Sequence, residues 1–131
     1  MNDKKLLIVD DDRDLLVGLS TRLRAQGYKV VTAPDAVTAI STAIKEKPEL
    51  IILDIGLPAG DGFAVLRRLR SLTSHATTPI IVLTARDPVT HRPRALQEGA
   101  TAFFQKPADN TELLTAIRTA LGETPPSATT A

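Results

Sequence analysis

The sequence predicts a doubly wound α/β domain, with a five-stranded parallel sheet and five helices packed on its two faces. Two observations support this prediction. Five short apolar runs are typical of strands in such a sheet, and amphipathic helical stripes separate them. The runs lie at residues 6–9, 29–32, 50–53, 79–83 and 101–105. Strands that alternate with helices form right-handed βαβ units, and these units build a parallel sheet.

The helices are predicted from apolar residues spaced three and four positions apart. The stripes lie at residues 13–26, 36–44, 63–69 and 113–121. Gly27 and Pro48 stand where the first two helices are expected to end. Asp35 is a plausible N-cap of the second helix, and Asp109 forms a capping-box pattern with Glu112 before the last one.

Composition places the chain among ordinary globular domains. It has 131 residues, 16 Lys and Arg against 15 Asp and Glu, and a net charge of +1, so we expect no strong generic attraction to nucleic acid. The absence of cysteine excludes thiolate metal sites and a cysteine nucleophile. We expect no signal peptide and no membrane span, and a cytoplasmic protein. Residues 123–131 are expected to form a disordered tail or a linker.

Polar side chains follow four of the predicted strands. Asp10, Asp11 and Asp12 come after the first, Asp54 after the third, Thr84 after the fourth and Lys106 after the fifth. Each has an ordinary explanation taken singly, as a helix cap, a turn residue or a surface lysine. Together they converge on the sheet edge where doubly wound folds bind ligands.

The chemistry of this edge suits phosphoryl transfer. Asp10, Asp11 and Asp54 would repel one another, and Mg²⁺ relieves such repulsion because it prefers oxygen ligands. The backbone carbonyl of Gly56 could also approach a metal closely. A carboxylate can act as a nucleophile towards phosphorus, while Lys106 can supply counter-charge to the phosphoryl oxygens.

The chain resembles the receiver domains of two-component response regulators over about residues 4–121. The resemblance rests on LIVDDD at residues 7–12, LDIGLP at 53–58 with DGF at 61–63, VLTA at 82–85, and KP at 106–107. It implies a flavodoxin-like fold with strand order 2-1-3-4-5 in residues 1–122.

The resemblance also implies a function: a phosphorylation-dependent switch, not a conventional enzyme, that accepts a phosphoryl group on Asp54. The implied donor is a sensor histidine kinase or a phosphotransfer protein, and the signal leaves through the fourth helix, fifth strand and fifth helix towards a protein target or output domain. The implied residues are Asp54, Thr84 and Lys106 for phosphoryl chemistry, Asp10, Asp11, Asp54 and Gly56 for Mg²⁺, and Thr84 and Phe103 for the switch.

The sequence departs from the family pattern in three places. Ala108 replaces the usual Phe after Lys-Pro, which predicts looser packing there. Phe103 lacks the hydroxyl of a Tyr, so it could also be a core aromatic that never moves. Because Pro93 is costly inside a helix, we expect Thr90 to cap a short helix of about residues 91–98, after a longer loop from Ala85.

Two side chains outside the motifs also bear on the site. Gly56 offers no shielding group beside Asp54, and Arg86 is long enough to lie across the mouth of the site. Elsewhere, His75 and His91 are expected at the surface. Arg67, Arg68 and Arg70 are expected to form a solvated helix face.

Three alternative functions remain open at the sequence level. In a haloacid-dehalogenase-like phosphatase, Asp10 would be the nucleophile and Asp12 the general acid, but Asp14 stands where that motif needs Thr. A flavin-binding domain would need a Ser/Thr/Gly phosphate loop after the first strand, where three aspartates would repel phosphate. A receiver that is no longer phosphorylated would not need the complete set of motif residues.

Overall fold

The computed structural model describes residues 3–57 and 62–123 as one sheet with helices on both faces. The elements are β1 Lys5–Val9, α1 Arg13–Ala25, β2 Lys29–Ala33, α2 Ala36–Glu46, β3 Leu50–Leu53, α3 Gly62–Ser71, the 3₁₀ helix η1 Thr73–His75, β4 Ile80–Thr84, α4 Pro88–Gln97, β5 Ala102–Gln105 and α5 Asn110–Ala120. Of the expected tail, only Glu123 lies within the described residues.

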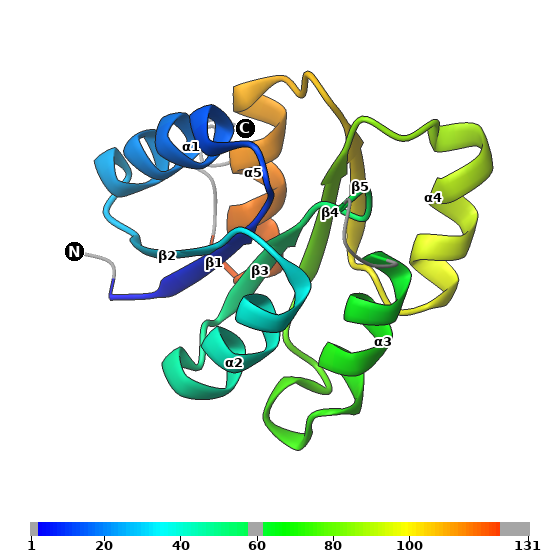
Figure 1. Ribbon diagram of the computed structural model, residues 1–131. Helices are drawn as coiled ribbons and strands as arrows, with labels where there is room; N and C mark the ends of the chain where they lie inside the picture. Colours follow the sequence, from blue (N-terminus) through cyan, green and yellow to red (C-terminus); the bar gives the residue numbers. More distant parts are fainter. Residues whose placement is uncertain (1–2, 58–61, 124–131) are drawn as a thin grey trace.

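The sheet is entirely parallel, in the order β2-β1-β3-β4-β5, which confirms the predicted fold class. Helices α1 and α5 cover one face, while α2, α3 and α4 cover the other (Figure 1). The central strands β1, β3 and β4 are buried almost throughout, because both faces are covered. Each face therefore has its own apolar core cluster.

Aspartate side chains cap four of the helices, α1, α2, α4 and α5. Asp12 accepts a hydrogen bond from the backbone N–H of Leu15 at the start of α1. Asp35 and Asp109 do the same for α2 and α5, as their positions in the sequence predict. These caps set the points at which the chain turns from the carboxyl ends of the strands into the helices.

Helix α4 begins earlier than the sequence indicated. We expected Thr90 to cap a helix starting near residue 91, but the helix starts at Pro88 and Asp87 is its cap. Pro88 is well suited to the first helical position, because the N–H groups there have no partner within the helix. Pro93 lies inside the helix, where it contributes no N–H to the carbonyl four residues earlier.

Two side chains expected at the surface are instead held by hydrogen bonds at the edge of the sheet opposite Asp54, where His75 is buried and Arg70 is half-buried. His75 is 2% exposed, and its Nε2–H donates to the carbonyl of Ala43 at 2.8 Å. Arg70 donates to the carbonyls of Gly99 and His75, so it ties the end of α3 to the segment before β5. Arg67 and Arg68 are exposed, as expected.

Candidate functional site

The candidate site forms where four strands end, at the carboxyl edge of the sheet. Asp10, Asp54 and Lys106 each follow a strand directly, and their backbone N–H groups donate to the carbonyls of Ala33, Val9 and Thr84 at 2.8–3.1 Å. Each of these bonds extends the pairing to a neighbouring strand by one residue. The sheet thereby fixes the backbones that carry the predicted site residues.

Lys106 joins the two buried carboxylates of the site. Its Nζ lies 2.7 Å from Oδ2 of Asp10 and 3.1 Å from Oδ2 of Asp54. Asp10 and Asp54 are 1% and 6% exposed, so this ammonium group offsets much of the cost of burying them. Asp10 also accepts a hydrogen bond from the backbone N–H of Asp12 at 2.9 Å.

Burial dominates the protonation of Asp10. It raises the pKa of the Asp10 carboxyl above its ordinary value, although the hydrogen bond with Lys106 opposes this effect. Burial alone would lower the pKa of Lys106, but hydrogen bonds and Coulombic attraction from Asp10 and Asp54 outweigh it, and the pKa of Lys106 is raised. The lysine is therefore charged at neutral pH. Ionisation of Asp10, by contrast, lowers the stability of the folded state.

Three carboxylates of the site lie close enough to share a cation. Oxygen atoms of Asp10, Asp11 and Asp54 all lie within 4.8 Å of one another, and Asp11 is exposed to solvent. Against these three negative charges, Lys106 supplies one positive charge. The donor set is all oxygen and carries excess negative charge, which fits Mg²⁺. Asp12 does not belong to this group, because its side chain caps α1.

Gly56 sits between the other predicted site residues. Its backbone N–H donates to Oδ1 of Asp54 at 2.8 Å. A Cβ atom at this position would lie 3.2 Å from the same oxygen, 3.2 Å from Nε of Arg86 and 3.5 Å from Oγ1 of Thr84. Arg86 therefore lies against the space that a side chain at position 56 would occupy, at the mouth of the site.

Thr84 and Phe103 lie deeper in the sheet. Thr84 is fully buried at the end of β4, and its hydroxyl oxygen accepts a hydrogen bond from the backbone N–H of Arg86 at 3.3 Å. Phe103 of β5 pairs in register with Val82 and is 8% exposed, within the core cluster on the α4 side of the sheet. Thr84 reaches the site, whereas Phe103 supports the strand beside it.

The geometry disfavours the phosphatase alternative. That hypothesis needs Asp10 as the nucleophile and Asp12 as a general acid. The Asp12 carboxylate instead caps α1 by accepting a hydrogen bond from the Leu15 N–H, so it is not available as that acid. Asp54 is the buried carboxylate that lies next to Gly56 and Lys106 and close to the acidic pair.

A second group of side chains joins α3 to α4. The rings of Phe63 and His91 are stacked with centroids 6.2 Å apart, and the guanidinium carbon of Arg94 lies 3.9 Å from the Phe63 ring centroid. His91 and Arg94 are three positions apart, so they share a helix face. Nothing in the sequence indicates that this face meets Phe63.

Comparison with known proteins identifies the class. The family model for the response regulator receiver domain matches residues 6–118. Response regulator MprA of Mycobacterium leprae is 40% identical over 93% of this chain and 53% of that protein. Transcriptional regulatory protein PrrA of Mycobacterium tuberculosis is 37% identical, over 89% of this chain and 49% of that protein. The chain thus spans about half the length of these curated relatives.

Solved structures agree with this class. A putative response regulator from Chloroflexus aurantiacus is 31% identical with a TM-score of 0.86, covering 93% of this chain and all of that one. The BeF3-activated receiver domain of Klebsiella pneumoniae RstA is 30% identical with a TM-score of 0.82, over 90% and 98% of the two chains.

A parallel sheet with an acidic cluster and a lysine at its carboxyl edge defines a receiver-type phosphorylation switch. The chain belongs to the response regulator receiver domain family of two-component signalling. Within residues 3–57 and 62–123, no helix has both the length and the apolar character needed to cross a bilayer.

The raised pKa of Asp10 predicts that Asp10→Asn stabilises the metal-free domain. A carboxyl whose pKa is raised by folding costs no stability below its ordinary value of 3.8, and costs stability as the pH rises through the raised value. Asn keeps the acceptor for the Asp12 N–H but carries no charge. We expect urea unfolding at pH 7 without Mg²⁺ to show a gain of about 1 kcal/mol, shrinking towards pH 4.

The control for this experiment is Asp11→Asn, which removes an exposed carboxylate and should change metal-free stability little. Addition of Mg²⁺ should stabilise the unmodified domain more than Asp10→Asn, because a ligand that binds the folded state raises its stability. If metal-free Asp10→Asn were less stable than the unmodified domain at pH 7, the ionised Asp10 carboxylate would not destabilise the folded state, and this interpretation would be wrong.

Proposed function

We propose that Asp54 accepts a phosphoryl group from a sensor histidine kinase or a phosphotransfer protein, with Mg²⁺ bound by Asp10, Asp11 and Asp54. The observation that carries this proposal is the position of Asp54. Its carboxylate lies 3.1 Å from the Lys106 ammonium and within 4.8 Å of the acidic pair. The backbone carbonyl of Gly56 is proposed as a further oxygen ligand.

The proposed step is a nucleophilic substitution at phosphorus. A carboxylate oxygen of Asp54 attacks the phosphorus of a phosphohistidine, the P–N bond breaks, and its electron pair returns to the imidazole nitrogen. Mg²⁺ would supply positive charge beside the transferring oxygens. Lys106 would contact one phosphoryl oxygen, and the Thr84 hydroxyl would donate to another. Hydrolysis of the resulting acyl phosphate would return the free carboxylate.

In this proposal, phosphoryl uptake and loss are the only chemistry of the domain. It acts as a signalling switch and not as a conventional enzyme, and we place it in the cytoplasm. Residues 1–122 form the receiver domain, and residues 123–131 are a tail or linker. The name of the PrrA relative, a transcriptional regulatory protein, supports an output in gene regulation. That output would be reached through a protein target or output domain, without direct contact between this domain and nucleic acid.

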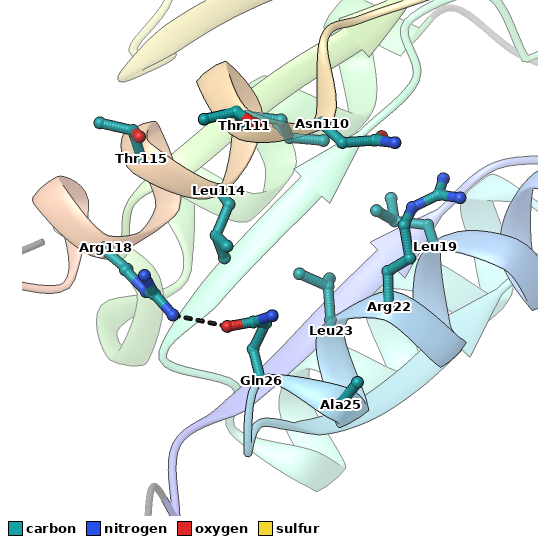
Figure 2. Close-up of a pocket in the computed structure, with 11 residues that line it drawn as sticks. Leu19, Arg22, Leu23, Ala25, Gln26, Asn110, Thr111, Leu114, Thr115 and Arg118 are labelled. Carbon is teal, nitrogen blue, oxygen red and sulfur yellow. Dashed lines mark hydrogen bonds between the residues drawn. The ribbon is translucent and has the colours of Figure 1, made fainter. Parts of the chain in front are cut away.

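We propose that the phosphoryl donor binds at a groove between α1 and α5, beside the site. A cavity of about 450 Å³ lies between α1 and α5, and the bond from Arg118 to Gln26 bridges it (Figure 2). It shares Leu19 and Arg22 with a second hollow of about 380 Å³ that reaches Lys106 and Ala108. The hollow agrees with the looser packing expected of Ala108. Among the described residues, no carboxylate lines either cavity, so a donor surface with acidic groups around an apolar contact would fit.

The signal is proposed to leave through α4, β5 and α5. The phosphoryl group brings about −1.5 to −2 charge and three acceptor oxygens to Asp54. Thr84 can donate to one of them only by moving, and the chain from residue 85 to α4 would follow. Because Phe103 is already buried in this structure, its part in the relay would be a repacking against β4 and α4, and not a swing from solvent.

Phosphoryl uptake should require Asp54 and a divalent cation. With acetyl phosphate and Mg²⁺, intact mass should show one added phosphoryl group on the unmodified protein and none on Asp54→Asn, because the nucleophile is absent. Asp10→Asn keeps the nucleophile and should need more Mg²⁺ to reach the same occupancy. Full uptake by Asp54→Asn together with none by Asp10→Asn would favour the phosphatase reading instead.

The lifetime of the acyl phosphate should depend on Arg86. The Arg86 side chain lies against the open space at Gly56, where an attacking water would approach Asp54. We expect Arg86→Ala to change the dephosphorylation rate severalfold while its Mg²⁺ affinity stays close to that of the unmodified protein. The decay of phosphorylated protein, followed by intact mass, measures this. An unchanged decay rate would remove Arg86 from the mechanism.

Amide spectra should report the relay. We expect beryllofluoride with Mg²⁺ to shift the amide resonances of Phe103 and of residues 85–92, because these segments connect Thr84 to α4. Residues of β2, at the far edge of the sheet, serve as the internal reference. Shifts confined to the immediate surroundings of Asp54, with Phe103 and residues 85–92 unaltered, would contradict the proposed relay.

A further inference from the structure

Helix α4 has little apolar burial to hold it on the sheet. Among its residues, Ala95 is the one that is buried, while Val89 is 83% and Leu96 40% exposed. In α3, by contrast, Phe63 and three other large apolar residues are buried. Since buried apolar surface is the main force that fixes a helix in place, other contacts must position α4.

The helix is also weakened internally. Pro93 carries no N–H, so the carbonyl of Val89 lacks the usual helical donor four residues later. The first turn is instead organised by Asp87, which accepts from the Val89 N–H and from the Thr90 hydroxyl. The N-terminal half of α4 is therefore stabilised by Asp87, which lies in the short connection between β4 and α4, directly after the site.

Side-chain contacts with α3 help to hold α4 in position, since α4 buries little apolar surface. Phe63 stacks against His91 with the ring planes 9° apart, and Arg94 lies over the Phe63 ring. A second contact joins Arg67 to Glu98 at 2.9 Å. We call Phe63, His91 and Arg94 the Phe63 clasp. A guanidinium over an aromatic face is attracted by the ring quadrupole, so the clasp joins two helices that stand side by side (Figure 1).

Both ends of the clasp are connected to the site. Phe63 lies in the first turn of α3, the helix that follows β3 and Asp54. His91 lies in the first half of α4, which begins four residues after Thr84. A movement of Thr84 towards a phosphoryl group would displace the start of α4, while Phe63, held in the core, resists that displacement.

We propose that the Phe63 clasp restrains the switch: it holds α4 against α3 before phosphorylation, and the phosphoryl group must overcome it to move α4. Phe63 and Arg94 are then positioning residues that act through α4 and do not touch the reacting atoms. This inference rests on the proposed function of Asp54. It adds a residue-level restraint whose strength sets how readily the domain is switched.

Hydrogen exchange of the unmodified domain tests the restraint itself. Phe63→Leu keeps apolar volume in the core but removes the ring. We expect amide exchange of the non-proline residues of α4 to accelerate about 5- to 30-fold, which corresponds to about 1–2 kcal/mol of lost ring contact. Exchange in α2 should not change. Phe63→Tyr keeps the ring and should behave like the unmodified domain.

A surface variant guards against the possibility that Phe63→Leu folds poorly. Arg94→Gln removes the cation from a half-exposed position and should accelerate exchange in α4 in the same direction. The matched control is Arg92→Gln, an exposed arginine two positions away on the same helix, which should leave exchange unchanged. Equal exchange in the Arg94 and Arg92 variants would overturn the clasp.

Beryllofluoride affinity, measured with Mg²⁺, tests the coupling to the site. A weaker restraint lowers the cost of the switched state, so Phe63→Leu and Arg94→Gln should bind beryllofluoride more tightly, by a factor similar to the change in exchange. Faster exchange with unaltered beryllofluoride affinity would overturn the inference and leave the proposed function standing. Failure of the unmodified protein to bind beryllofluoride would instead overturn the proposed function, and the inference with it.

Discussion

The ammonium group of Lys106 balances the charge on which the site depends. Two carboxylates, Asp10 and Asp54, are buried at neighbouring strand ends, and a third, Asp11, lies close by at the surface. Among the described residues, Lys106 is the cation within ion-pair distance of the buried two. The site therefore stays negative overall, and this excess charge is the physical reason that a divalent cation is expected to bind there.

The parallel sheet explains why so much of the site could be predicted from sequence. In such a sheet all strands end at one edge, so the residue after each apolar run becomes a neighbour of the others without any knowledge of side-chain packing. Asp10, Asp54 and Lys106 come together for this reason, and Thr84 closes the adjacent strand. Helix caps such as Asp35 and Asp109 could also be predicted, because a cap depends on residues only three positions apart.

Features that depend on contacts between distant segments could not be predicted. The sequence around His75 indicates a polar surface residue. Only the fold shows that α2 places the Ala43 carbonyl within hydrogen-bond distance of its ring. Arg70 lies in a run of arginines, and only the fold places the Gly99 carbonyl beside it. The start of α4 was misplaced for a local reason. Pro93 favours a late start because it is costly inside a helix, whereas Asp87 and Pro88 together provide a cap and a first helical residue.

The hydrogen bonds of Arg70 have a mechanical consequence for α4. They hold the Gly99 carbonyl, just beyond the C-terminal end of that helix, against α3 at the edge of the sheet opposite Asp54. In the proposed relay, the helix would be anchored at its far end and displaced at its near end, so that Gly99 would act as a pivot and α4 as a lever. A ten-residue helix is about 15 Å long, and a rotation of about 10° would carry its first turn about 3 Å. The surface around Val89 would travel furthest, and a binding partner there would receive the largest displacement.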